Sequence, residues 1–238
     1  NLKNINKVIA LPKCKSIKIV KEVYKNLGKK IIFTNKIKEA ETAKVVENIQ
    51  RDLNIAFINE IFIFCKKLKL DFKEVMRLAN SKWNFLNFKP GLVGGHCLPV
   101  DPYYFYEIAK RNKYECKVTL AGREVNNGMT KFISALILSD IKKKKIKTKI
   151  LIAGLTYKPD VTDIRNSLAI QVFKNVKKKF KNVEGYDPLL KKSKIQNLVL
   201  KNNLKFKEYS RVYILTDHSF FNTKKFKTKK VKRVFQDL

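Results

Sequence analysis

The chain has 238 residues, of which 45% are hydrophobic, so it is long enough to bury one large core or two small ones. Its longest apolar stretch, Ile55–Cys65, is interrupted by Asn59 and Glu60 and is too short to span a bilayer, and the first residues show no signal-peptide pattern. Membrane insertion and secretion are therefore not indicated, and we expect a cytoplasmic globular protein.

The net charge of +33 is extreme. It would suit a polyanion partner, because clustered cations bind phosphate backbones by releasing counterions. Only seven of the 53 basic residues are arginine, however, and the lysines are spread along the chain. Proteins that read nucleic acid favour the bidentate guanidinium group. Lysines on solvated faces explain the charge more simply, so we expect no nucleic-acid partner.

The first 35 residues predict the end of a larger α/β domain. Apolar residues recur at helical spacing from Ser16 to a C-cap glycine at Gly28, and Lys30–Thr34 follows as a strand. One helix and one strand without their sheet cannot bury their apolar faces. We therefore expect residues 1–35 to be the remnant of a domain encoded mostly upstream.

Residues 36–145 predict a helical middle domain. Lys38–Leu70 contains no Gly or Pro and has apolar residues at helical spacing, which predicts one long helix. Further helices are expected at Asp71–Asn80, at about 103–111 and at about 120–142, with an irregular segment over Ser81–Tyr104 and a solvated linker at Lys142–Lys145.

Residues 146–238 predict an α/β domain. The expected elements are a strand at Ile150–Ala153, a turn at Gly154–Asp163, a helix at Asn166–Phe180, and strands at Val183–Tyr186, Val212–Thr216 and Arg233–Phe235. An order of strand, helix and strand implies a parallel sheet with helices on its faces.

The irregular segment carries the candidate chemistry. Cys97 follows two glycines and stands four residues before Asp101. Such a loop can present a thiolate to a carbonyl carbon, but the same residues would also suit a plain tight turn. His96 has no partner histidine, which favours a packing role over a metal site. The other cysteines show no paired spacing and are interpreted as structural: Cys14, Cys65 and Cys116.

Three motifs resemble the UDP-glucose/GDP-mannose dehydrogenase family, and most closely its bacterial UDP-N-acetyl-D-glucosamine/galactosamine 6-dehydrogenases. The active-site signature is matched by Trp83–Leu86, Lys89–Cys97 and Val100–Tyr104; the central helix by Ala40–Lys44, Glu47–Asn48 and Arg51–Ala56; the C-terminal domain by Gly154–Asp160 and Asp163–Arg165. The resemblance weakens after Pro188. It implies an α/β fold with an N-terminal Rossmann-like remnant, a long central helix in a helical domain, and a C-terminal Rossmann-like UDP-binding domain.

The resemblance implies oxidation of C6 of a UDP-N-acetylhexosamine to the carboxylate, using two NAD⁺ and a cysteine thioester. Cys97 would be the nucleophile. Lys44 would polarise the reacting oxygen or transfer a proton, Asn48 would donate to the oxyanion, and Asp101 would support the water step. Lys44 and Asn48 are four residues apart, so they share a helix face. Without the resemblance they would be interpreted as a solvated lysine and a surface asparagine.

The resemblance also implies the binding residues. The loop along the UDP-sugar would be Phe88, Lys89, Pro90, Gly91, Leu92, Val93 and Gly94, and Tyr157 and Lys158 would contact the substrate from the C-terminal domain. Lys82 stands where much of the family has an arginine that reaches across the dimer, and Arg165 matches a residue that contacts the NAD phosphate. A homodimer through the central helix is expected, and no metal.

The sequence departs from the family at both ends. It contains no GxGxxG turn for the NAD pyrophosphate, and it stops before a family arginine that contacts substrate. We therefore expect the chain alone not to catalyse the reaction. The implied role is surface polysaccharide biosynthesis. The alternatives are a basic polyanion-binding protein and a folded remnant without catalysis.

Overall fold

The structure is a computed structural model that describes residues 4–11, 17–25, 27, 30–190, 198–199 and 204–238. The chain divides into two compact units, residues 1–50 and 51–238. Helix α2 (Ile37–Leu68) begins in the first unit and ends in the second. Within the described residues, no helix is both long and apolar enough to cross a membrane.

The first unit contains a small parallel sheet. Strand β1 (Lys7–Ala10) pairs with β2 (Ile31–Thr34), and α1 (Ile17–Tyr24) connects them. The predicted helix and strand are therefore present, but the expectation that they lack a sheet was wrong, because β1 was not recognised. The predicted helix ends, Ser16 and Gly28, lie outside the described residues.

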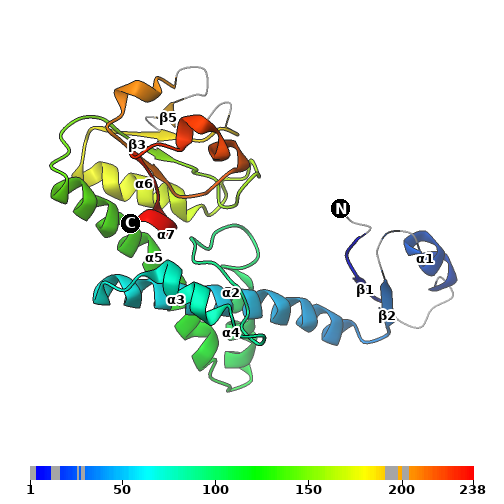
Figure 1. Ribbon diagram of the computed structural model, residues 1–238. Coiled ribbons are helices and arrows are strands. Elements are labelled where there is room, and N and C mark those ends of the chain that lie inside the picture. The colour runs from blue at the N-terminus through cyan, green and yellow to red at the C-terminus, as the bar shows by residue number, and fades with distance from the viewer. Residues whose placement is uncertain (1–3, 12–16, 26, 28–29, 191–197, 200–203) are drawn as a thin grey trace. The chain divides into compact units, whose positions relative to one another are not determined.

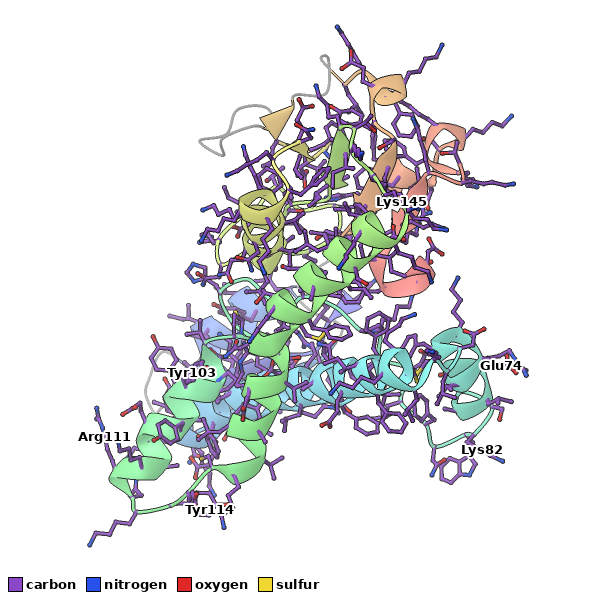
Figure 2. All side chains as sticks on the ribbon, turned by 90° about the vertical axis from the view of Figure 1, so that its left-hand side faces the viewer. Glu74, Lys82, Tyr103, Arg111, Tyr114 and Lys145 are labelled. Carbon is purple, nitrogen blue, oxygen red and sulfur yellow. The ribbon has the colours of Figure 1, made fainter. Side chains whose placement is uncertain are left out.

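The helices of the second unit follow the sequence pattern closely. The predicted long helix is confirmed as α2. Helix α3 (Phe72–Ala79) begins after Asp71, whose carboxylate accepts the backbone N–H groups of Lys73 and Glu74. Helix α4 (Asp101–Arg111) begins two residues earlier than predicted, because Pro102 is tolerated in a first turn. Helix α5 (Lys117–Lys143) begins three residues early. Figure 2 shows the chain leaving α4 at Arg111 and turning past Tyr114 into α5, which runs toward Lys145.

The C-terminal part of the second unit is a five-stranded parallel sheet in the order β5-β4-β3-β6-β7 (Figure 1). Its strands are β3 (Ile150–Ala153), β4 (Val183–Tyr186), β5 (Leu198–Val199), β6 (Arg211–Ile214) and β7 (Val231–Arg233). The helices are α6 (Leu168–Lys179), α7 (Val234–Asp237), η3 (Phe206–Glu208), η4 (Ser219–Asn222) and η5 (Lys224–Phe226). The parallel sheet is confirmed. The last strand lies two residues before its predicted position, since Val234 opens α7, and β5 was not predicted.

The central strand β3 separates two hydrophobic cores. Ile150 and Ile152 face the core shared with α5 and α6, whereas Leu151 and Ala153 face the core formed with η4 and η5. A strand that buries both faces is uniformly apolar, which is why its bounds could be predicted. At the end of β3, Gly154 has a φ of +75°, and a Cβ there would lie 2.1 Å from the carbonyl oxygen of Thr216. Only glycine fits this turn, which leads the chain to Tyr157.

Candidate active site

Cys97 lies in the loop between α3 and α4. Its side chain is exposed, whereas Cys65 and Cys116 are buried. The carbonyl oxygen of Cys97 accepts the backbone N–H groups of Val100 and Asp101, at 3.0 and 2.8 Å. These bonds fold the loop into a tight turn that leads into α4, whose first residue is Asp101. The turn therefore presents an accessible thiol four residues before the start of α4.

The two glycines before His96 let the loop contact the turn that follows β3. A Cβ on Gly95, which has a φ of +92°, would lie 2.7 Å from the ring of Tyr157. A Cβ on Gly94 would lie 2.6 Å from the backbone carbonyl oxygen of Asn166, and the side-chain Nδ2 of Asn166 donates to the carbonyl oxygen of Gly95 at 3.1 Å. The C-terminal domain thus packs directly on the loop that carries Cys97.

A cavity of about 640 Å³ lies between α3, the residues that precede Cys97, and the C-terminal domain. Six of the predicted substrate-binding residues line it: Phe88, Lys89, Pro90, Gly91, Leu92 and Tyr157. The opposite walls come from α3, from the residues after β6 and from α7. Sequence segments far apart in the chain therefore meet around one cavity.

The cavity combines positive charge with apolar surface. Lys73, Arg77 and Lys89 line it, against one carboxylate, Asp217. The guanidinium of Arg77 is also paired with Glu74, with 2.6 Å between Nη2 and Oε1, and this pair orients the Arg77 side chain at the cavity edge. Aromatic side chains stand on several walls, among them Phe72, Phe88 and Phe235. Such a lining suits a ligand that has a flat ring and anionic groups.

Four predicted binding residues lie outside this cavity. Val93 is buried, and Gly94 is covered by Asn166. Lys158 is exposed, and its carbonyl oxygen accepts the hydroxyl of Thr156 at 3.1 Å. Lys82 is exposed in the turn after α3, on the outside of the molecule in Figure 2. Their contacts with a substrate remain predictions.

Arg165 and Asp163 form a surface pair. The guanidinium contacts both carboxylate oxygens, with its Nη2 at 2.6 Å from Oδ2 and its Nε at 3.0 Å from Oδ1. These hydrogen bonds from Arg165 lower the pKa of Asp163 to about 2. The predicted contact between Arg165 and NAD phosphate stays a prediction.

Lys44 and Asn48 lie one turn apart on α2, in the first unit, whereas Cys97 and Asp101 belong to the second. Asn48 is buried and Lys44 is exposed. Their predicted roles at Cys97 therefore remain predictions.

The sequence did not single out His218, which supports the turn around Tyr157. Its Nδ1 accepts the N–H of Asp160 at 2.9 Å, so in the neutral ring Nε2 carries the proton and faces Asp187 at 3.1 Å. Burial by itself would raise the pKa of Asp187, but hydrogen bonds from His218 and from the N–H groups of Leu189 and Leu155 outweigh it and lower the pKa.

Comparison with known proteins identifies the family. Residues 38–128 match the UDP-glucose/GDP-mannose dehydrogenase family, central domain, and residues 151–238 match its UDP binding domain. The UDP-N-acetyl-D-glucosamine 6-dehydrogenase of Salmonella typhi is 36% identical over 92% of this chain and 53% of its own length. Protein CapL of Staphylococcus aureus is 40% identical over 77% of this chain and 44% of its own length.

A solved structure agrees with these relatives. The UDP-N-acetyl-mannosamine dehydrogenase from Staphylococcus aureus matches with a TM-score of 0.77 and 33% identity, over 98% of this chain and 55% of that protein. The chain thus spans about half the length of the relatives it matches. It belongs to the UDP-glucose/GDP-mannose dehydrogenase family of NAD-dependent oxidoreductases.

Proposed function

We propose that this chain supplies the nucleotide-sugar-binding, thiol-bearing half of a dehydrogenase that oxidises C6 of a UDP-N-acetylhexosamine to the uronic acid. The observation that carries the proposal is the cavity lined by six family-matching residues, whose lining loop leads within a few residues to the exposed thiol of Cys97. The relatives from Salmonella typhi and Staphylococcus aureus are UDP-N-acetylhexosamine dehydrogenases by name, which supports this substrate class.

The cavity has the size and lining that a UDP-sugar needs. Its volume, about 640 Å³, lies within the usual range for small-molecule sites. Lys73, Arg77 and Lys89 offer cations to a diphosphate, and Phe72 and Phe88 offer apolar surface to a uracil or sugar ring. Lys73 and Arg77 are also paired with Asp237 and Glu74, and Asp217 is paired with Arg233. With these partners counted, the lining keeps one positive charge in excess, which favours an anionic ligand over a neutral sugar.

The chain's own residues would carry the covalent part of the reaction. The Cys97 thiolate would add to an aldehyde carbon at C6 and prevent the aldehyde from escaping. Asp101, four residues further on, would assist water in hydrolysing the thioester formed later, and Lys44 and Asn48 would stabilise charge on the oxygen. Arg165, the predicted NAD contact, is paired with Asp163, so an NAD phosphate would compete with that carboxylate for the guanidinium.

The test is binding of UDP-N-acetylglucosamine and UDP-N-acetylgalactosamine to this chain, measured by calorimetry. We expect saturable binding, and slower alkylation of Cys97 by iodoacetamide in its presence, followed by mass spectrometry of the Cys97 peptide. Of the described cysteines, Cys65 and Cys116 are buried and serve as internal references. Absence of UDP-sugar binding, together with tight and salt-sensitive binding of DNA or heparin, would replace the proposal with the polyanion-binding alternative.

We also infer that the chain forms a homodimer through α2. Phe57, Phe64 and Leu68 repeat at intervals of seven and four residues on one face of this helix, and each side chain is more than half exposed. Trp83, in the turn after α3, is 96% exposed. Apolar surface of this extent in a monomer usually marks an interface.

The dimer predicts a specific result for charged substitutions. Phe57→Glu combined with Phe64→Glu should convert a dimer to a monomer in sedimentation velocity, because two buried carboxylates per protomer would lose their water without gaining partners. Ile108→Glu, at an equally exposed apolar position on α4, is the matched control and should leave the dimer intact. A wild-type chain that sediments as a monomer would disprove the α2 interface.

A further inference from the structure

Asn59 holds the backbone of the cavity-lining loop with two hydrogen bonds. Its side chain, which lies on α2 and is 0% exposed, donates from Nδ2 to the carbonyl oxygen of Gly91 at 3.0 Å and accepts the N–H of Gly91 at Oδ1 at 2.9 Å. Both polar groups of one loop residue are thereby bound by one amide. Gly91 lines the cavity and Asn59 does not, so Asn59 holds a wall residue from the protein interior.

A second layer of polar side chains fixes the amide of Asn59. Its Nδ2 also donates to Oδ1 of Asn126 at 2.9 Å, so the amide cannot turn over without losing bonds on both sides. Asn126 in turn donates from Nδ2 to Oδ1 of Asp52 at 2.8 Å and to its backbone oxygen at 3.0 Å. Asn59 and Asn126 are fully buried, and Asp52 nearly so, which leaves little room for another arrangement.

The same hydrogen-bond network continues from Asp52 to Tyr103, which follows Cys97 in the sequence. Asp52 accepts Nη1 of Arg123 at 2.6 Å, and Arg123 donates from Nη2 to Asn127 at 2.6 Å. Asn127 then donates to the hydroxyl of Tyr103 at 3.1 Å, on α4, which begins just after Cys97. One connected set of side chains therefore holds the chain at Gly91, before the thiol, and at Tyr103, after it.

Stability alone does not account for this arrangement. Buried ionic and polar groups lose their hydration, and well-packed apolar residues of the same volume often serve a core as well or better. Within the described residues, Oδ2 of Asp52 and Nε of Arg123 are buried without a hydrogen-bond partner, so part of that loss stays uncompensated. Such a set is more readily explained by the geometry it imposes on the loop.

We propose that Asn59 is a positioning residue for nucleotide-sugar binding: its paired hydrogen bonds to Gly91, oriented by Asn126, Asp52 and Arg123, set the cavity wall in its binding geometry. This inference rests on the proposed function. Asn59 itself does not line the cavity, so it acts through Gly91 and touches no ligand.

The experiment compares wild type with Asn59→Leu and Asn59→Ser, using UDP and UDP-N-acetylglucosamine as probes. Leucine keeps the volume but removes both bonds to Gly91, and we expect at least about tenfold weaker UDP-sugar binding by calorimetry. Hydrogen exchange of the peptide that contains Gly91 should become faster, because its N–H loses an acceptor. Serine leaves space for water to bridge to Gly91 and should recover part of the affinity.

A stability control separates positioning from general weakening. Ile137→Ala opens a cavity in the core at a fully buried position of α5, and should lower the thermal midpoint while leaving UDP-sugar affinity and Gly91 exchange unchanged. Equal losses of affinity in Ile137→Ala and Asn59→Leu, or wild-type affinity in Asn59→Leu, would overturn the positioning role. If the wild-type chain binds no UDP-sugar, the proposed function fails instead. Unchanged hydrogen exchange at Gly91 in Asn59→Leu would separately show that the hydrogen bonds from Asn59 do not hold the backbone of Gly91.

Discussion

Replacing Cys97 with serine is expected to lower uronic acid formation by about a thousandfold or more, when the chain is joined to the part of the Salmonella typhi relative that it does not cover. A cysteine thiol is partly ionised near neutral pH, whereas a serine hydroxyl without a dedicated base is not, so the proposed addition to the aldehyde carbon would be lost. The measurement is uronic acid formed from UDP-N-acetylglucosamine, with two NADH expected per uronic acid in the unsubstituted chimera and NADH without uronic acid expected in the variant.

Cys116→Ser provides the matched control. Cys116 is buried at the N-cap of α5, where serine is a favourable residue, so this variant should keep its activity. If Cys97→Ser still forms the uronic acid at a comparable rate, Cys97 is not the nucleophile. A chimera that forms neither NADH nor uronic acid from any UDP-N-acetylhexosamine would count against the proposed function as a whole.

The fold was predictable wherever the apolar pattern had one explanation. Ile150–Ala153 is apolar at every position, as a strand buried on both faces requires, and its bounds were predicted correctly. Two strands escaped prediction: β1 begins with lysine and so is not apolar throughout, and β5 has only two residues. At the C-terminus, Val234 looked like a strand residue, but its buried side chain belongs to the first turn of α7.

The candidate site was predictable only where a contiguous motif marked it. The loop from Phe88 to Cys97 could be found because its residues are adjacent in sequence. Asn59 and Asn126 could not, since they meet across 67 residues and neither belongs to a local motif. A signal was nevertheless present, because Asn59 interrupts the apolar stretch of α2 next to the buried Ile58. A polar residue on a buried helix face needs a partner, and here that partner is Gly91 in the cavity-lining loop.

Replacing Arg123 with methionine is expected to destabilise the chain by about 3–5 kcal/mol, the usual result of removing one member of a buried ion pair. Arg123 and Asp52 are both buried, with Nη1 and Oδ1 2.6 Å apart. Burial already raises the pKa of Asp52 above its ordinary value of 3.8, and the charge and hydrogen bond of Arg123 oppose that shift. Without Arg123, the pKa of Asp52 should rise further.

This shift gives the loss of stability a pH dependence of known sign. A carboxyl group whose pKa is higher in the folded state binds more protons there, so the free energy of unfolding falls as the pH rises from 3.8 through the folded pKa. Urea unfolding should therefore show a smaller deficit for Arg123→Met at about pH 5 than at about pH 8.

Two further variants decide whether the unpaired charge is the cause. Adding Asp52→Asn to Arg123→Met should recover much of the lost stability and remove the pH dependence, because no buried carboxylate is then left unpaired. Arg77→Met, which breaks an exposed pair with Glu74, should change the stability little at either pH. A loss of stability that is the same at both pH values and persists in the double variant would show that Arg123 stabilises the chain through packing. The buried ion pair of Asp52 and Arg123 would then have no electrostatic role.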